Sequence, residues 1–414
     1  MKIILSILLL SSLSFCKKKE EDKNSLSLLL LPGAVSSYNW NLPSGYPLPK
    51  VPESNLMTEA KVKLGRFLFY DKRLSGNETM SCASCHLQKL AFSDGKSLPQ
   101  GITGVKNTKN SIALVNVAYN GRQNWANSLI KTLEEQAGVP LQGVNPVELG
   151  LDVGDEELKK RLMKYEAYES MFKLAFPGET EPITLDNVKK AIAAFQRTLI
   201  SSDSPYDRYT YKNNKLALSA SALRGMDVFN GEAAECFHCH GGFNFTDSSS
   251  HTATSVETNL YHSNGLYNIN GSYPSEQRGL IDLTGIAEDM GKFKAPTLRN
   301  IALTYPYMHD GSIMCDDSQN PEKIAGKTMD DCATDALGKV IDQYMNGGNN
   351  STCRPTDPNF PCRTDNNIST VDKTLIRKFS LSSGEKADLI NFLKSLTDET
   401  FISNPAFSDP FVNQ

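Results

Sequence analysis

The sequence has no long apolar run and no excess of one charge, and each absence excludes a class of protein. Its apolar stretches near the start, residues 3–10 and 26–31, are far shorter than the roughly 20 residues of a helix that crosses a bilayer. Lysine and arginine number 43 against 47 acidic residues, for a net charge of −4. Such a balance lacks the basic footprint of a nucleic-acid-binding protein, so we expect neither a nucleic-acid partner nor a membrane-spanning helix.

Histidine and tryptophan are also scarce, with six His and two Trp in 414 residues. No His occurs between His86 and His238. Two of the six end CxxCH pentapeptides that begin at Cys82 and Cys236. In such a motif two thiols form thioethers with one haem and the His binds its iron. The residues predicted to hold two covalent haems c are Cys82, Cys85, His86, Cys236, Cys239 and His240.

A zinc site and a thioredoxin-like dithiol are the alternatives for these motifs. Four thiolates around zinc would leave His86 and His240 without a role. Neither segment resembles the strand-to-helix junction that carries a thioredoxin dithiol. Covalent haem accounts for both His, and His238, inside the second motif, is interpreted as a spacer rather than a ligand.

The first residues predict export. Lys2 precedes an apolar segment that runs into Leu13-Ser14-Phe15-Cys16, which is the layout of a signal peptide. Residues 1–16 resemble a bacterial lipoprotein signal that leaves the lipid on Cys16, although Phe15 stands where a small residue is usual. An ordinary signal sequence, cut elsewhere, is the alternative. We expect a periplasmic protein that reaches a membrane only through this lipid, with residues 17–50 as its tether.

The cysteine count fits an exported chain. Of nine cysteines, one would carry the lipid and four the haems. The remaining Cys315, Cys332, Cys353 and Cys362 predict two disulfides. Pairing Cys315 with Cys332 and Cys353 with Cys362 is the simplest of three possible pairings. All four fall in residues 313–370, an Asp-, Asn- and Pro-rich insertion that we expect to be largely loop.

The chain also repeats itself weakly. Thr58 and Ser219 each open an amphipathic segment that leads into a CxxCH motif, and both residue types cap helix N-termini. Residues 188–199 and 389–396 carry helical apolar stripes, the second behind a Ser382/Glu385 capping box. Few stretches alternate with the strand period. The sequence predicts a mainly α fold with long loops, in which residues 51–202 and 203–400 form two tandem cytochrome c-like haem domains.

Together these features resemble the bacterial dihaem cytochrome c peroxidase family, including its MauG-like branch, over nearly the whole mature chain. Besides both CxxCH motifs, the matching segments are residues 64–66, 71–75, 92–95, 133–137, 145–148, 295–300, 306–312 and 386–389. The resemblance implies an oxidoreductase whose N-terminal haem reacts with peroxide and whose C-terminal haem transfers electrons.

The resemblance also assigns roles to single residues. Glu148 stands where the family has its distal carboxylate, which can move a proton between the two oxygens of H2O2, and Gln136 where it has a distal amide. A solvated loop carboxylate is the alternative for Glu148. Trp125 occupies the position of the inter-haem tryptophan, although Ala126-Asn127-Ser128 replaces the usual residues after it. Asn110, Thr304 and Pro306 match positions that bind one Ca2+ through oxygen atoms.

Two departures from the family concern the irons. Some members cap the peroxidatic haem with a loop His, whereas this chain has Gly101-Ile102-Thr103 at that position, so its iron is expected to be open at rest. Classical members place a Met on the far side of the C-terminal haem. Here Tyr344 is in register and Met345 follows one residue later; a Tyr ligand would lower the potential of this haem.

The sequence therefore predicts a dihaem peroxidase that reduces H2O2 to water. Electrons would come from a cytochrome c or a similar small periplasmic donor and enter at the C-terminal haem. A MauG-like oxidase of a protein side chain and a non-catalytic electron carrier are the alternatives. Glu148 and Gln136 argue against the carrier, because electron transfer alone needs no acid–base group above an open iron.

Overall fold

The computed structural model describes residues 38–254, 261–267, 272–315, 327–348, 371–372 and 375–412. The predicted signal peptide with Cys16 and most of the tether lie outside these residues, as do Cys353 and Cys362. What the sequence predicts for them stays a prediction.

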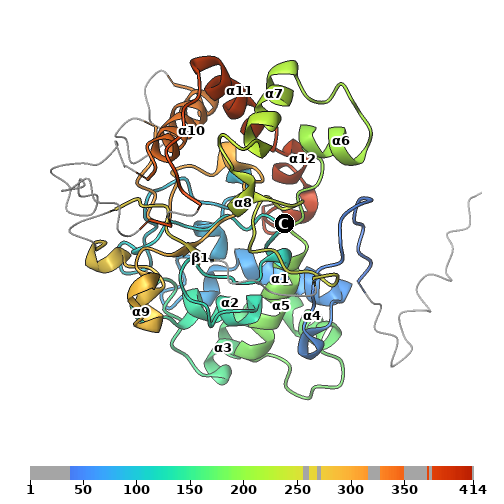
Figure 1. Cartoon of the computed structure of the whole chain (residues 1–414). Helices are drawn as coiled ribbons and strands as arrows, with labels where there is room; N and C mark the ends of the chain where they lie inside the picture. Colours follow the sequence, from blue (N-terminus) through green and yellow to red (C-terminus); the bar gives the residue numbers. More distant parts are fainter. Residues whose placement is uncertain are drawn as a thin grey trace, which may run out of the picture. The chain divides into compact units, whose positions relative to one another are not determined.

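Helices dominate the described residues, as predicted, and the sheet among them consists of two antiparallel two-residue strands. The helices are α1 (Glu59–Tyr70), α2 (Leu133–Gln142), α3 (Asp155–Leu162), α4 (Ala167–Ala175), α5 (Leu185–Arg197), α6 (Pro205–Tyr211), α7 (Ala220–Asn230), α8 (Phe237–His240), α9 (Ile281–Thr284), α10 (Met329–Met345), α11 (Ser383–Lys394) and α12 (Glu399–Ile402), and the strands are β1 (Tyr261–His262) and β2 (Phe293–Lys294). Long loops connect them (Figure 1). None of the described helices is long and apolar enough to cross a membrane.

Each CxxCH motif follows a helix that crosses a partner helix at a glycine. α1 packs on α5, where a Cβ on Gly65 would lie 1.8 Å from the carbonyl oxygen of Ala191. α7 packs on α11 in the same way, and a Cβ on Gly225 would lie 1.9 Å from the carbonyl oxygen of Asp388. The two glycines thus set how closely the helices approach, and they recur at matching places in the sequence repeat.

The predicted helix starts are confirmed. The hydroxyls of Thr58 and Ser219 each accept the backbone N–H of the third residue along, both at 3.1 Å, and Ser382 and Glu385 form the expected capping box of α11. Each cap satisfies an N–H group that has no partner within its own helix.

Three apolar clusters fill the interior. One joins α1, α2, α4 and α5 through residues such as Phe69, Phe172 and Phe195. Another joins α7, α10 and α11, with Phe229 and Phe392 in its centre. The third, which we call the Trp125 cluster, consists of Trp125, Leu266, Tyr267, Tyr273 and Phe293.

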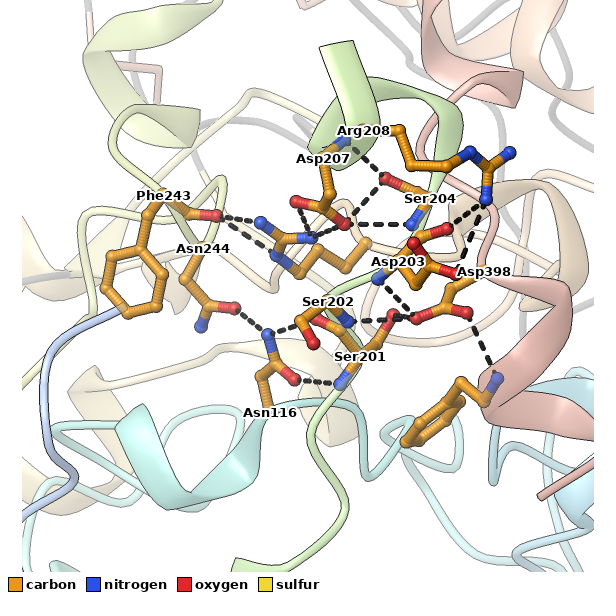
Figure 2. A network of polar contacts seen from close by, with 12 residues as sticks. Asn116, Ser201, Ser202, Asp203, Ser204, Asp207, Arg208, Phe243, Asn244 and Asp398 are labelled. Carbon is orange, nitrogen blue, oxygen red and sulfur yellow. Dashed lines mark hydrogen bonds and ion pairs between the residues drawn. The ribbon is translucent and has the colours of Figure 1, made fainter. Parts of the chain in front are cut away.

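A buried polar network fixes the segment between the two predicted domains (Figure 2). One carboxylate oxygen of Asp398 accepts the backbone N–H groups of Ser202 and Asp203, each at 2.9 Å. The amide oxygen of Asn116 accepts the N–H of Ser201 at 2.7 Å. The segment is therefore bound both to Asn116 in the N-terminal half and to Asp398 near the end of the described chain.

Arg299 and Asp207 form an ion pair in the same network, with Nη1 2.9 Å from Oδ2 and both side chains fully buried. Arg299 Nε also donates to the carbonyl oxygen of Phe243 at 3.0 Å. Buried charges of this kind are stable only when paired and hydrogen-bonded, so each partner depends on the other.

The region 313–370 is partly helical, so the prediction that it is largely loop is wrong for residues 329–345. α10 spans 17 residues there. Its start is fixed by a Thr328/Asp331 capping box, and its buried face includes Ala333, Ala336 and Leu337. The predicted bridge between Cys315 and Cys332 is present, with 4.8 Å between the Cα atoms. It attaches α10 to the preceding loop.

Candidate active site

His86, Gln136 and Glu148 line one cavity of about 350 Å³, together with Cys82 and Cys85. The two cysteines are free thiols. His86 Nδ1 lies 2.8 Å from the carbonyl oxygen of Phe92, which can only accept, so Nδ1 carries the proton and Nε2 is left to bind a metal.

Local backbone geometry produces this contact. Ala91 and Phe92 both adopt the left-handed conformation, with φ of 52° and 61°. The resulting tight turn directs the carbonyl group of Phe92 back to the imidazole. Burial lowers the pKa of His86, against the effect of this hydrogen bond, and the neutral imidazole is the form that binds iron.

Two hydrogen bonds position Glu148, one to its side chain and one to its backbone. Asn107 Nδ2 donates to its Oε1 at 2.9 Å, and the N–H of Ile102 donates to its backbone carbonyl oxygen at 2.8 Å. Gly101 packs so closely that a Cβ there would lie 2.0 Å from the carbonyl oxygen of Val147 and 2.8 Å from Glu148 Cα. Burial raises the pKa of Glu148, and the bond from Asn107 opposes that rise.

Gln136 comes from the first turns of α2, which starts at a Thr132/Glu135 capping box. Its amide oxygen is buried and has no hydrogen-bond partner among the described residues. The same holds for the amide oxygen of Gln196, which comes from α5 and lines the same cavity. Buried polar atoms are nearly always paired, so these two indicate a polar occupant of the cavity.

A second cavity, of about 640 Å³, contains Cys236, Cys239 and His240 on its wall. Both cysteines are free thiols. His240 Nδ1 lies 3.3 Å from the carbonyl oxygen of Phe245, whose φ is 50°. The contact repeats the one made by His86, and both imidazoles line their cavities. His238 is also at this cavity, with its side chain 41% exposed.

Trp125 lines both cavities. Its side chain is buried, and its indole N–H donates to the carbonyl oxygen of Asn110 at 2.8 Å. Its own carbonyl oxygen accepts the N–H of Lys294 in β2 at 2.8 Å. Trp125 thus lies on the walls of both cavities and is held by one side-chain and one backbone hydrogen bond.

Tyr344 and Met345 differ in position, although they are neighbours at the end of α10. Tyr344 lines the second cavity, and Met345 is not among the lining residues. Met345 packs instead against the apolar cluster of α7, α10 and α11. Of these two neighbours, Tyr344 is therefore the one on the wall of the second cavity.

The predicted calcium ligands stay a prediction. Asn110 Nδ2 donates to the carbonyl oxygens of Lys96 and Ser97, at 2.8 and 3.2 Å, and its N–H donates to that of His309 at 2.8 Å. This places Asn110 beside the segment that follows Thr304 and Pro306. Among the described residues, one group of His, Cys and acidic side chains could hold a metal ion, at Cys239, Asp247 and His262, and it lies apart from those three predicted ligands in the sequence.

Three residues at the first cavity have no signal in the sequence: Asn107, Gln196 and the close-packed Gly101. Asn107 lies in a segment without a recognisable motif, and the apolar stripe of residues 188–199 predicts a helix but not that Gln196 reaches the cavity, which depends on how distant loops and helices pack.

The residues 59–215 match the family model of di-haem cytochrome c peroxidase. The cytochrome-c peroxidase IdrP1 of Pseudomonas sp. (strain SCT) is 30% identical over 88% of this chain and 87% of its own length. The methylamine utilization protein MauG of Methylophilus methylotrophus is 32% identical, over 83% of this chain and 84% of that protein.

Two solved structures have a fold similar to that of this chain. A crystal structure of a MauG-like protein associated with microbial copper homeostasis is 42% identical, with a TM-score of 0.77, over 90% of this chain and 99% of that one. The diheme peroxidase BthA from Burkholderia thailandensis E264 has a TM-score of 0.60 at 20% identity, over 87% and 92% of the two chains, which is a likeness of fold alone.

Proposed function

Since this chain belongs to the di-haem cytochrome c peroxidase family, an oxidoreductase family that includes MauG, we propose that it reduces H2O2 to water at the cavity of His86, Gln136 and Glu148. The observation that carries the proposal is the partly buried carboxyl of Glu148, held by Asn107 at 2.9 Å on the wall of the cavity that contains His86. A group of that kind serves proton transfer and is not needed for electron transfer alone.

The residues of both cavities fit a covalent haem better than zinc. Each cavity has two free thiols and one imidazole whose Nδ1 is already engaged by a carbonyl oxygen. The thiol pairs line different cavities, so a shared four-thiolate zinc site has no support. Intact mass of the exported protein should exceed that of the polypeptide by two haems, and a mass with zinc or no haem would refute this assignment.

Glu148 and Gln136 would have different roles in the reaction at the first cavity. The haem supplies the redox chemistry, since reduction of H2O2 to two waters takes up two electrons and two protons. Glu148 accepts the proton of one peroxide oxygen and delivers it to the other, which then leaves as water. The unpaired amide oxygen of Gln136 accepts a hydrogen bond from peroxide and orients it without changing charge.

Glu148→Gln tests this role, because it keeps the size of the side chain and removes the base. We expect the rate of reaction with H2O2 to fall on the order of a hundredfold or more, with unchanged haem content. Glu135→Gln is the matched control, since Glu135 is an exposed residue of α2 that caps the helix. A Glu148→Gln variant as fast as the wild type would show that this carboxyl takes no part.

Electrons are proposed to enter at the C-terminal haem and to reach the N-terminal haem through Trp125. The donor would be a small protein such as a cytochrome c. The periplasmic location and the lipid on Cys16 belong to the same proposal and rest on residues 1–16 alone. Cys16→Ser should release the protein from the membrane fraction if that lipid is present.

A second function, MauG-like oxidation of a protein side chain, is favoured by one observation. Tyr344 lines the second cavity and Met345 does not, and a Tyr ligand would give that haem a low potential. A low potential makes a small cytochrome c a poor donor. The MauG-like neighbour at 42% identity agrees with this alternative. Steady-state turnover of H2O2 with reduced cytochrome c distinguishes the two functions, because only the first sustains it.

A further inference from the structure

Three buried tyrosines donate a hydrogen bond to an aspartate within the part of the chain that the structure describes. Tyr168 pairs with Asp71 at 2.6 Å, Tyr46 pairs with Asp207 at 3.0 Å, and Tyr267 pairs with Asp310. Arginines neutralise two of these aspartates. Asp71 is 2.8 Å from Arg73, and Asp207 is 2.9 Å from Arg299.

Asp310 differs from the other two. Like Asp207 it is fully buried, but no lysine or arginine among the described residues forms an ion pair with it. Its second oxygen accepts the N–H of Ser312 at 3.0 Å, and the ammonium of Lys109 acts on it only over a longer range. An arginine in contact with a carboxylate weakens it as a base. Of the three aspartates, Asp310 is therefore the best proton acceptor.

Tyr267 also has the right neighbours for electron transfer. It belongs to the Trp125 cluster, and its ring centre lies 5.5 Å from that of Tyr273 and 6.5 Å from that of His309. His309 stacks on Phe293 at 3.5 Å, and His309, Phe293 and Trp125 all line the second cavity. A continuous set of aromatic rings thus connects Tyr267 to the wall of the C-terminal haem site.

We propose that Tyr267 is a redox-active tyrosine whose phenolic proton passes to Asp310 when the residue is oxidised. The inference rests on the proposed function, because the oxidant is the haem pair after reaction with H2O2. Reduction of H2O2 to two waters withdraws two electrons from the enzyme, and one of them comes from Tyr267. The O–H bond of the phenol breaks, the new O–H bond forms on Asp310 Oδ2, and a tyrosyl radical remains.

The geometry explains why Tyr267 and not its neighbour takes this role. Tyr273 belongs to the same cluster, but its hydroxyl faces the Ser263 hydroxyl at 3.3 Å. A serine hydroxyl is a weaker base than a carboxylate, so the contact of Tyr273 with Ser263 favours proton transfer less than that of Tyr267 with Asp310. Proton transfer needs an acceptor within hydrogen-bond reach, and Asp310 gives Tyr267 a carboxylate there.

The experiment mixes ferric holoenzyme with H2O2 in the absence of a donor, freezes the samples within the reaction time, and records EPR and haem absorption together. Wild type and Tyr273→Phe should show a tyrosyl radical, Tyr267→Phe should lose it, and Asp310→Asn should diminish it. Ring-deuterated tyrosine in the wild-type chain should narrow the signal, which identifies a tyrosyl radical without any substitution.

The two readouts separate this inference from the proposed function. If haem absorption changes on addition of H2O2 but no tyrosyl signal forms, the inference is wrong and the function stands. A signal that persists in Tyr267→Phe, or that disappears in Tyr273→Phe instead, also overturns it. If the haem absorption does not respond to H2O2 at all, the proposed function fails and the inference fails with it.

Discussion

Replacing Asn107 by alanine should move the acid limb of the reaction with H2O2 to higher pH. Asn107 donates to Glu148 at 2.9 Å, and this bond opposes the rise in the pKa of Glu148 that burial causes. A hydrogen bond to a charged group contributes about 1.5–3 kcal/mol, and one pKa unit corresponds to about 1.4 kcal/mol. Since the bond is only partly buried, we expect a shift of about one pH unit and at most about two.

The sign follows from the role of the carboxylate. Glu148 accepts a proton in its ionised form, so the rate falls as the pH falls through its pKa. Loss of the Asn107 donor removes stabilisation of the ionised form, so the pKa rises and the same loss of rate occurs at a higher pH.

The assay is stopped-flow measurement of the second-order rate of ferric holoenzyme with H2O2, from acid to neutral pH. Asn124→Ala is the matched control, because Asn124 lines the same cavity and its side chain accepts the N–H of Ala126 at 3.3 Å. The reasoning is refuted if the limb of Asn107→Ala stays in place, or if Asn124→Ala moves it equally. Glu148→Gln should show no such limb.

Three further predictions follow from single features of the chain. Without a loop His to cap the N-terminal iron, the ferric protein should show a high-spin component and react with H2O2 before any reduction; two low-spin signals and no reaction until an electron is added would contradict this. Tyr344→Phe should change the low-spin spectrum of the C-terminal haem and Met345→Leu should leave it intact, and the reverse result would make Met345 the ligand. Arg299→Met leaves Asp207 buried without its partner, so the free energy of unfolding should fall by about 3–5 kcal/mol. Arg208→Met, which removes a partly exposed pair with Asp203, should cost less than about 1 kcal/mol, and equal losses in denaturant melts would show that burial does not matter here.

The sequence by itself determined the features that depend on a few neighbouring residues. A CxxCH motif lies within five consecutive residues. In the caps at Thr58 and Ser219 and the capping box at Ser382, the side chain and its backbone partner are three residues apart. The mainly α class followed from such signals and from helical spacing. Local signals also have limits, since the polar composition of residues 313–370 concealed α10, whose buried face is visible only once its packing partners are in place.

Only the tertiary structure decided which residues share a cavity. Asn107 and Glu148 are 41 positions apart, and their bond exists because the loop at Gly101 packs on the backbone of Glu148. Tertiary packing also places Trp125 on the walls of both cavities. It likewise brings Tyr267 to Asp310, which is 43 positions away in the sequence. No periodicity or motif encodes these pairs, because the free energy that brings them together comes from packing the whole chain rather than from the residues beside them in sequence.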